Sequence, residues 1–321
     1  MKQYESQSDA IWKRHNEMRI LITGIQGFIG WHLSEFLKSN GHEVIGIQHN
    51  VKATTDSSNI HDCNMLNETR LTDILRDNAP TIVFHLAAQS LPSVSWKSPE
   101  DTLMNNIIST LNLLRCIQKL RLDTQVILLG SSSEYAASNE PIREDSPLKP
   151  SSPYAVSKIA SSLLSRLYYE AYGADVIIAR PFFIIGPRKT NDVCSSFARG
   201  IVEIENGHAK TLTVENLNAI RDFLDIDDGV QALWTVSQKG ESGETYNISS
   251  GVGTPIMRVL EMLTSATRTK ILTQTNYADN RRLDPPIVIG NNQKLKNLGW
   301  SPGVSLTESL SKILDYWRRQ S

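Results

Sequence analysis

The apolar positions in the first half of the chain fall into short runs separated by amphipathic stretches, a pattern that predicts strands alternating with helices. The candidate strands are the runs at 19–23, 42–48, 81–86, 125–130 and 174–179. The run at 81–86 is continuously apolar, as is typical of a parallel strand buried on both faces. The predicted fold is therefore α/β, a Rossmann-type doubly wound parallel sheet.

A glycine-rich turn, Gly24-Ile25-Gln26-Gly27-Phe28-Ile29-Gly30, follows the first strand at once and runs into a helix that stops at Asn40-Gly41. A strand, a glycine turn and a helix N-terminus in this order predict a dinucleotide phosphate site. The glycines let the backbone approach a pyrophosphate, whose charge meets the N–H groups of the helix N-terminus. The spacing is GxxGxxG, one residue wider at its first gap than the commonest Rossmann fingerprint.

The end of the second strand bears on which cofactor would bind. A carboxylate is expected there if the ribose 2′-hydroxyl of NAD is to be held, but the residues are Gln48, His49 and Asn50. A 2′-phosphate would not be repelled at this position, and Lys52 could assist it. NADP(H) is therefore favoured, and NAD(H) is possible.

Two later segments are further candidates for cofactor contact. In Asp62-Cys63 an acidic side chain could reach the adenine edge, although a solvent-exposed loop Asp is nearly as good an interpretation. In Leu86-Ala87-Ala88, which ends the third predicted strand, small residues would let the backbone lie close to the cofactor.

Residues 151–158, Ser-Ser-Pro-Tyr-Ala-Val-Ser-Lys, open a helix predicted over 155–169, with Leu163, Leu164 and Leu167 on an apolar stripe. Tyr154 and Lys158 are four residues apart and would share one face. An ammonium beside a phenol favours the phenolate and draws its pKa from about 10 toward the working range. Such a pair could pass a proton to or from a sugar oxygen while hydride moves elsewhere. The alternative is a surface Tyr and Lys on an ordinary amphipathic helix.

A hydroxyl partner for this pair is available in Ser131, which follows the strand predicted over 125–130 and begins Ser131-Ser132-Ser133-Glu134-Tyr135. A serine at the carboxyl end of a parallel strand faces the ligand crevice. A polar turn capped by serines is the alternative, but the Tyr154/Lys158 helix about twenty residues later favours a catalytic role.

The strand–helix alternation weakens after residue 185. Short strands at 210–214 and 221–228, a helix at 227–238 and a strand at 245–249 that returns to the main sheet are expected. We predict an N-terminal extension over 1–17, an NAD(P)-binding Rossmann domain over 18–185, and a smaller interleaved C-terminal domain over 186–321 that binds substrate. About 222–252 would return to the Rossmann domain.

Composition narrows the class of protein. With 40% hydrophobic and 21% charged residues, the 321-residue chain is expected to be globular. A net charge of −1 argues against a general nucleic-acid binder, and no apolar run is long enough to span a membrane. Cys63, Cys116 and Cys194 are odd in number and widely spaced, so reduced cytoplasmic thiols and no metal are expected.

Together these motifs resemble the extended short-chain dehydrogenase/reductase family, the NAD-dependent epimerase/dehydratases, over essentially all of the chain from Met18. The matching residues are Gly24, Gly27, Gly30, Asp62, the turn Ala87-Ala88-Gln89-Ser90, Asn106, Ser131, Tyr154, Lys158 and Gly186-Pro187. Within that family the chain is most similar to the GDP-mannose branch, and particularly to GDP-4-keto-6-deoxy-D-mannose reductases. The segments that carry this are 130–135, 216–223, 246–251 and 289–296, the last running into Gly299-Trp300.

The resemblance implies an NAD(P)H-dependent reductase of a nucleotide-linked 4-keto-6-deoxyhexose, with GDP-4-keto-6-deoxy-D-mannose to GDP-D-rhamnose as the best guess. Tyr154 would be the general acid, Lys158 would hold the nicotinamide ribose, and Ser131 would hydrogen-bond the carbonyl. A homodimer through the long helices that begin near Pro99 and Ser152 is implied too. The substrate-binding positions would be Gln89, Ser90, Ser132, Ser133, Phe183, Arg221 and Arg281, with Arg282 as a substitute for Arg281.

Two departures from the family pattern bear on function. The related 4,6-dehydratases carry acidic residues where this chain has Ser132 and Ser133, and Glu134 comes one residue late, so a dehydratase is disfavoured. Phe183 stands where the branch usually has an Asn that contacts the nucleotide sugar. The alternatives are a nucleotide-sugar 4-epimerase, which uses the same three residues but keeps its NAD, and a non-catalytic NAD(P)-binding protein.

Overall fold

The computed structural model describes residues 18–50, 59–276 and 285–321. The expected extension over 1–17 and the side chains of Lys52, Arg281 and Arg282 lie outside the described residues. The described chain divides into two compact units. Unit 1 holds residues up to 129, 160–178 and 241–244, and unit 2 holds residues 130–159, 179–240 and 245–321.

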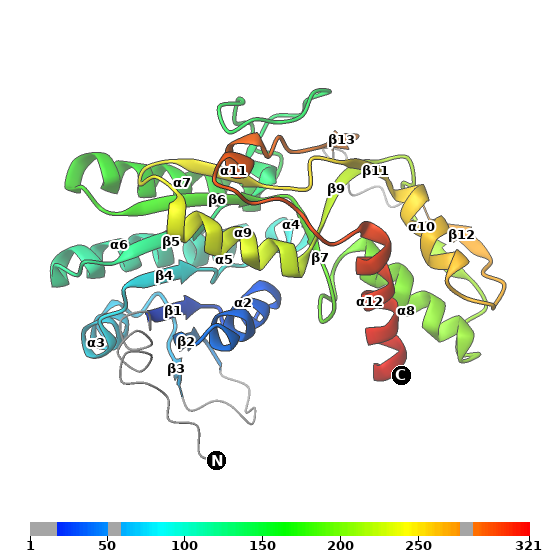
Figure 1. The fold of residues 1–321 in the computed structure, drawn as a ribbon, viewed down its shortest axis with the longest axis horizontal. Helices are drawn as coiled ribbons and strands as arrows, with labels where there is room; N and C mark the ends of the chain where they lie inside the picture. The colour runs from blue at the N-terminus through cyan, green and yellow to red at the C-terminus, as the bar shows by residue number, and fades with distance from the viewer. Residues whose placement is uncertain (1–17, 51–58, 277–284) are drawn as a thin grey trace, which may run out of the picture. The chain divides into compact units, whose positions relative to one another are not determined.

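The main sheet has seven strands in the order β10-β6-β5-β4-β1-β2-β3 (Figure 1). The pairs β2–β3, β1–β2, β1–β4 and β4–β5 are parallel. The order reverses between β1 and β4, which makes their carboxyl ends the topological switch point of a doubly wound sheet. The predicted α/β Rossmann-type fold is confirmed. The strands are β1 Arg19–Thr23, β2 Glu43–Gln48, β3 Ile60–Asp62, β4 Ile82–His85, β5 Gln125–Leu129, β6 Val176–Pro181 and β10 Thr245–Ile248.

Unit 1 is built around buried strand residues such as Leu21, Ile45 and Val83, which pack against apolar side chains of α3 and α6. The long helix expected from Pro99 is continuous but changes its winding, with a π-turn over Met104–Ile108 between α5 and α6. Its helices are α2 Phe28–Ser39, α3 Glu68–Asn78, α4 Pro92–Ser95, α5 Pro99–Leu103 and α6 Ser109–Leu120, and α7 Pro153–Tyr172 begins in unit 2 and continues here.

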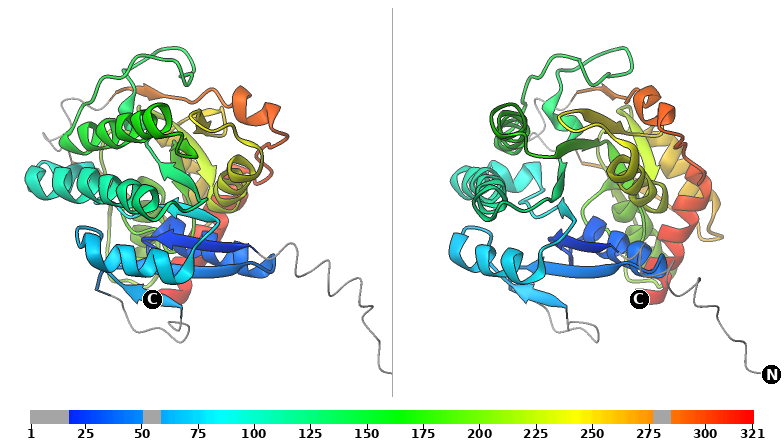
Figure 2. Two further views of the ribbon diagram at one scale, coloured as in Figure 1. Left: turned by 90° about the vertical axis from the view of Figure 1, so that its left-hand side faces the viewer. Right: turned by 60° about the vertical axis from the view of Figure 1, so that its left-hand side comes forward.

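Helix α7 runs alongside α6, with Ser161 Oγ donating a hydrogen bond to the carbonyl of Asn106 (Figure 2). The side chains that α7 buries are small and polar, among them Ser157, Ser161, Ser162 and Ser165. Leu163 and Leu167, expected on an apolar stripe, are 58% and 54% exposed. Serine side chains are short enough to let the two helices approach closely, so the leucines are on the outward face.

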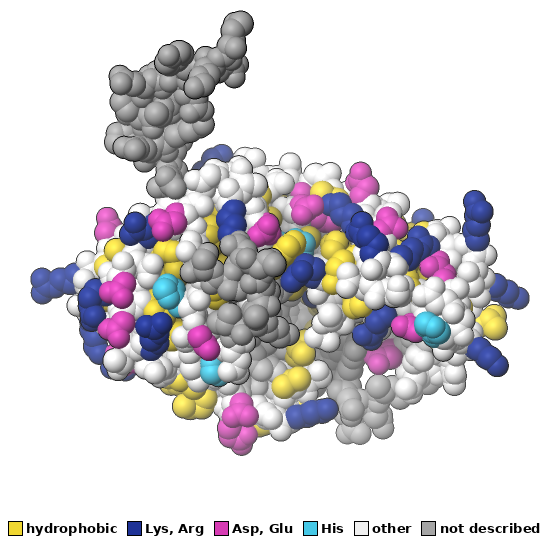
Figure 3. Space-filling view, turned by 90° about the horizontal axis from the view of Figure 1, so that it is seen from below, with side chains coloured by type: hydrophobic (Ala, Val, Ile, Leu, Met, Phe, Trp, Pro, Cys, Tyr) yellow, Lys and Arg dark blue, Asp and Glu magenta, His cyan; other side chains and the backbone are white. Residues whose placement is uncertain are grey.

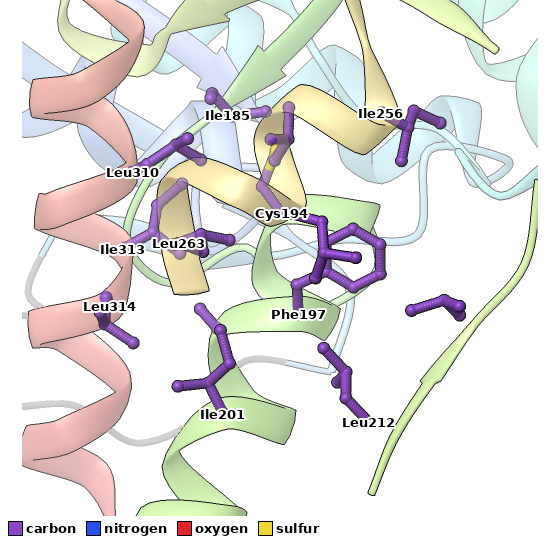
Figure 4. Packing of buried hydrophobic residues seen from close by; sticks show 14 of the residues in the cluster. Ile185, Cys194, Phe197, Ile201, Leu212, Ile256, Leu263, Leu310, Ile313 and Leu314 are labelled. Atoms are coloured by element: carbon purple, nitrogen blue, oxygen red, sulfur yellow. The ribbon is translucent and has the colours of Figure 1, made fainter. Parts of the chain in front are cut away.

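Unit 2 contains a four-stranded sheet in which β9 Ile220–Asp225 pairs with β11 Gly253–Pro255, β13 Ile287–Val288 and β7 Phe183–Ile185. A separate pair joins β8 Leu212–Val214 to β12 Thr273–Thr275. The helices are α8 Val193–Glu205, α9 Ile226–Lys239, α10 Ile256–Ser265, α11 Gln293–Asn297 and α12 Leu306–Gln320. Side chains of α8, α10 and α12 interlock in one apolar core, where Phe197, Leu263 and Ile313 are fully or nearly fully buried (Figure 4).

Three aspartates spaced three residues apart tie the C-terminal segments to β9 and α9. Asp222 accepts hydrogen bonds from the backbone N–H groups of Ser250, Gly251 and Gly290. Asp225 caps α9, so the strand expected over 221–228 ends at Asp225 and the helix expected from 227 begins at Ile226. Asp228 accepts hydrogen bonds from the N–H groups of Gly303 and Val304.

On the face shown in Figure 3, basic and acidic side chains are interspersed, in keeping with the net charge of −1. Over the part of the chain that the structure describes, no helix is both long and apolar enough to cross a membrane.

Candidate active site

The three residues expected to carry the chemistry lie together in unit 2. Ser131 follows β5, and the first turns of α7 carry Tyr154 and Lys158. The side chains of Tyr154 and Ser131 are hydrogen-bonded, and Lys158 Nζ lies 6.0 Å from the centroid of the Tyr154 ring. All three residues are buried, with 9%, 8% and 6% of the surface of Ser131, Tyr154 and Lys158 exposed. A hydroxyl, a phenol and an ammonium are therefore grouped in one desolvated part of unit 2.

The turn after β5 is a single 3₁₀ turn, Ser132–Glu134, closed by a capping box. Ser131 Oγ accepts from the Ser133 N–H at 3.2 Å, and the Ser131 N–H donates to Glu134 Oε1 at 2.8 Å. Ser133 Oγ lies 2.7 Å from Ser131 Oγ. The turn fixes the backbone on both sides of the Ser131 hydroxyl.

Glu134 anchors a polar network that the sequence analysis missed. Its side chain is fully buried, and Oε2 forms an ion pair with Arg180 at 2.9 Å. Arg180 also donates to Tyr135 Oη at 2.9 Å, and that hydroxyl donates to Asn247 Oδ1 at 2.7 Å. Two sequence signals could have found it. Ser131-x-x-Glu134 is the capping-box pattern, and an arginine within an apolar strand needs a buried acid.

The pKa of Tyr154 is shifted in the opposite direction from the one expected. Burial raises the pKa of Tyr154 to about 12, an effect that its hydrogen bond with Ser131 only partly offsets. Burial also lowers the pKa of Lys158 to about 8, against the opposing attraction of the Glu134 carboxylate. Removing both groups from water disfavours their charged forms, and in each case burial is the largest cause of the shift. At pH 7 the phenol is protonated and most of the ammonium is charged.

The glycine turn of unit 1 is as tight as the sequence implied. Gly24 has φ +72°, and a Cβ on Gly30 would lie 2.3 Å from the Gly24 carbonyl oxygen. Gly27 is the N-cap of α2, and no side chain caps that end of the helix. This cradle of bare backbone with an uncapped helix N-terminus fits the pyrophosphate of a dinucleotide. Phe28 and Ile29, which were also expected to contact the cofactor, lie in the first turn of α2, where the Phe28 ring contacts the His32 ring.

The ends of β2 and β3 meet beside this turn. Gln48 Oε1 accepts a hydrogen bond from the Gln26 N–H at 3.2 Å, which places an uncharged amide next to the glycine turn. The exposed Asp62 accepts from the Asn50 N–H at 3.2 Å. Cys63 is buried, and its thiol lies 3.4 Å from the Asn64 carbonyl.

The loop after β4 is held by two buried polar residues. The N–H groups of Leu86 and Ala87 both lie 3.1 Å from Thr23 Oγ1, at the end of β1. Asn106, in the π-turn, exchanges hydrogen bonds with both backbone groups of Gln89. The loop 86–90, which includes Ala88 and Ser90, is thereby fixed at the switch point of the sheet.

Two residues expected to contact substrate are partly used for packing. Arg221 is buried, donates to the carbonyls of Ile220 and Pro286, and places Cζ 5.4 Å from the centroid of the Phe183 ring. Phe183 in turn packs against Phe223. The Arg221 side chain therefore also contributes to the packing of unit 2.

Among the described residues, no group of three or more His, Cys, Asp or Glu side chains is placed to hold a metal ion. The parallel sheet, the glycine cradle at its switch point and the Ser131–Tyr154–Lys158 group define the class of protein: a dinucleotide-binding α/β enzyme.

The family is given by comparison with known proteins. Residues 21–313 match the family described as GDP-mannose 4,6 dehydratase. The chain is 31% identical to GDP-6-deoxy-D-mannose reductase of Pseudomonas aeruginosa over 305 residues, covering 93% of this chain and 97% of that one. The chain therefore belongs to this family of nucleotide-sugar enzymes, and the resemblance to the epimerase/dehydratases and their GDP-mannose branch is confirmed.

Other relatives catalyse different reactions on related substrates. The chain is 26% identical to UDP-glucose 4-epimerase of Mycolicibacterium smegmatis, covering 95% of this chain and 100% of that one. Among solved structures, RMD from Pseudomonas aeruginosa complexed with NADPH superposes with a TM-score of 0.85 at 30% identity, covering 95% of this chain and 100% of that one. UDP-glucose 4-epimerase of Thermotoga maritima with UDP-glucose gives 0.84 at 26% identity, covering 94% and 99%.

The lowered pKa of Lys158 predicts a falling limb in the pH profile of turnover. The ammonium is charged below pH 8 and neutral above it, and only the charged form stabilises negative charge that develops on Tyr154. We expect kcat/KM to be level from pH 6.5 to about 7.5 and to fall by about tenfold per pH unit above pH 8. In Lys158→Arg, whose guanidinium stays charged, the fall should move beyond pH 9.5 whatever its absolute rate. A level wild-type profile up to pH 9.5 would contradict this role.

Proposed function

We propose that this protein is an NAD(P)H-dependent reductase that converts a nucleotide-linked 4-keto-6-deoxyhexose to the corresponding 6-deoxyhexose. The best candidate reaction is GDP-4-keto-6-deoxy-D-mannose to GDP-D-rhamnose. The observation that carries the proposal is a protonated, buried Tyr154 hydrogen-bonded to Ser131 beside a charged Lys158. Such a phenol suits a reaction that needs an acid.

The residues of the turn after β5 support a reductase over a dehydratase. The two positions directly after Ser131 are the uncharged Ser132 and Ser133, which cannot deprotonate a sugar carbon. Glu134 Oε1 and Oε2 are engaged by the Ser131 N–H and by Arg180. No carboxylate of this turn is left to serve as the base that elimination requires.

In the proposed mechanism, a bound nicotinamide cofactor supplies the hydride that reduces C4. Ser131 Oγ and Tyr154 Oη hydrogen-bond the C4 carbonyl oxygen and orient it. As the oxygen gains negative charge, Tyr154 transfers its proton to it. The ammonium of Lys158 stabilises the negative charge left on the phenol oxygen, and it also holds the nicotinamide ribose. The low exposure of all three residues strengthens these electrostatic contacts.

For the cofactor, we propose that the glycine cradle binds the pyrophosphate and that the end of β2 favours NADPH. Gln48 places an amide, not a carboxylate, beside the Gln26 N–H, so a 2′-phosphate meets no repulsion there. A carboxylate is present at Asp62, but it is turned toward the Asn50 N–H. The NADPH complex of the Pseudomonas aeruginosa relative points the same way.

For the substrate, we propose a nucleoside diphosphate held by Arg221, with Arg281 as a second cation. Two carbonyls and the Phe183 ring hold the Arg221 guanidinium in one orientation. A preordered guanidinium loses less entropy on binding an anion than a mobile one. Guanosine is the proposed base because the chain is similar to enzymes of GDP-sugars. Gln89, Ser90, Ser132 and Ser133 remain proposed contacts of the sugar.

The reaction type is tested by supplying purified protein with NADPH and GDP-4-keto-6-deoxy-D-mannose. We expect one NADPH consumed per sugar reduced, faster than with the UDP-linked analogue. Tyr154→Phe should bind NADPH as wild type does and lose about 10²–10⁴-fold in turnover, which is what general acid catalysis contributes. Tyr169→Phe, the same change at an exposed position of the same helix, serves as the control. Tightly retained NAD with no net consumption would indicate a 4-epimerase instead.

Cofactor preference is tested at Gln48. In Gln48→Asp a carboxylate would repel the 2′-phosphate and accept from the ribose hydroxyls of NADH. The ratio of kcat/KM for NADPH over NADH should fall by about tenfold or more, the equivalent of about 1.4 kcal/mol. Gln48→Asn shortens the side chain without adding charge and should leave the ratio near wild type. An unchanged ratio in Gln48→Asp would remove this position from cofactor selection.

We further propose a homodimer that pairs the outward faces of the helical run 99–120 and α7. Leu163 and Leu167 of α7 and Met104 of the π-turn are each more than half exposed. Apolar side chains gathered on one helical face of a globular protein mark an interaction surface. A two-fold axis between copies would bury the same face on both.

The dimer is tested by the mass of the protein in solution. Leu163→Lys with Leu167→Lys should convert a dimer of about twice the 35.9 kDa chain mass into a monomer, measured by light scattering. Leu272→Lys, at an equally exposed leucine outside this face, should remain dimeric. A wild-type protein that is monomeric at micromolar concentration would refute the proposal.

A further inference from the structure

The Glu134 carboxylate is placed to do more than hold a turn together. It is completely buried, and its two oxygens have different partners. Oε1 accepts the Ser131 N–H at 2.8 Å, and Oε2 accepts Arg180 Nε at 3.0 Å and lies 2.9 Å from Arg180 Nη2. The backbone of Glu134 is fixed too, because its N–H donates to the Ser131 carbonyl and its carbonyl accepts from the Lys149 N–H. The residue is held at four points, two of them on Ser131.

Arg180, which pairs with this carboxylate, is itself locked. Its Cζ lies 4.7 Å from the centroid of the Tyr135 ring, and Nη1 donates to Tyr135 Oη. Asn247, which accepts from that hydroxyl, donates from Nδ2 to the Ile142 carbonyl. The ion pair therefore holds Ser131 in a fixed position, since neither charge can move without breaking several buried hydrogen bonds.

The negative charge of the Glu134 carboxylate also affects the protonation of Tyr154 and Lys158. Lys158 lies beside Tyr154 of its own helix, and the charge of Glu134 on the turn after β5 acts on it, with Arg180 of β6 paired to Glu134. The negative charge of Glu134 raises the pKa values of both Lys158 and Tyr154. The carboxylate thus favours a charged ammonium and a protonated phenol, which is the combination that a proton donor in this site needs.

We propose that Glu134 is a positioning residue for the reaction: held by Arg180, it fixes the backbone of Ser131 through the Ser131 N–H and so orients the Ser131 hydroxyl toward Tyr154. A consequence of the same arrangement is that the buried negative charge of Glu134 favours the ammonium form of Lys158. The effect on turnover rests on the proposed reductase function. The effect on Lys158 does not, because it is a property of the protein without substrate. The two ideas can therefore fail separately.

The test measures the titration of Lys158 directly, by NMR of protein carrying lysine labelled with ¹³C at Cε. The Lys158 signal is the one missing from Lys158→Arg. The wild-type midpoint is expected at about pH 8. Glu134→Gln keeps an oxygen for the Ser131 N–H but removes the charge, and it should lower the midpoint by roughly one pH unit, the low end of what an adjacent opposite charge produces.

Two further variants separate this effect from simple loss of structure. Glu144→Gln removes a carboxylate that accepts the Asn247 N–H at the far end of the same network, and its midpoint should match wild type. Glu134→Gln with Arg180→Met removes both buried charges, so no unpaired guanidinium is left if the single variant fails to fold. Its Lys158 midpoint should be lowered as in Glu134→Gln.

Turnover provides the second readout. In Glu134→Gln the falling limb of kcat/KM should move to lower pH by the same interval as the NMR midpoint. A Lys158 midpoint unchanged in both Glu134 variants, with only the unfolding temperature reduced, would overturn the proposal and leave Glu134 a structural residue. A lowered midpoint in a protein that reduces no keto-sugar would support the role of Glu134 while refuting the reductase.

Discussion

The candidate active site depends on one buried ion pair. Glu134 and Arg180 are both withdrawn from water, and either charge left alone would cost several kcal/mol, about 3–5 in comparable cases. The pair is stabilised by further hydrogen bonds, because Glu134 Oε1 accepts from the Ser131 N–H and Arg180 Nη1 donates to Tyr135 Oη. These hydrogen bonds fix the turn after β5, and the turn fixes the position of Ser131. The serine in turn holds the hydroxyl of Tyr154, so the geometry of the proton donor is set by a carboxylate that never touches substrate.

The parts of the fold set by local chemistry could be predicted from the sequence. The apolar runs gave β1, β4 and β5 to within one residue at most ends, and Gly24, Gly27 and Gly30 predicted the backbone cradle. Tyr154 and Lys158 were placed on one helix face by their spacing alone. Each of these features depends on residues that are neighbours in the chain, where periodicity and backbone geometry are sufficient.

Features that depend on tertiary context could not be predicted in this way. Hydrophobic periodicity put Leu163 and Leu167 inside, but α7 buries Ser161 and Ser165 because its neighbour α6 lies too close for larger side chains. The pKa of Tyr154 was misjudged for a related reason, since spacing reveals a nearby ammonium but not the loss of water around both groups. The Glu134–Arg180 pair joins residues 46 positions apart. The capping-box pattern at Ser131 and the arginine within an apolar strand each indicate one partner, but no local pattern pairs the two.

The central claim is that hydride is delivered to C4 of the sugar and stays there, with Tyr154 supplying the proton. The most direct measurement uses NADPH that carries deuterium at C4 of the nicotinamide, together with GDP-4-keto-6-deoxy-D-mannose, and mass spectrometry of the sugar product. The account predicts one deuterium bound to C4 of the product for each NADPH oxidised. A product without deuterium, or a sugar whose configuration changes while the labelled cofactor is not consumed, would contradict it.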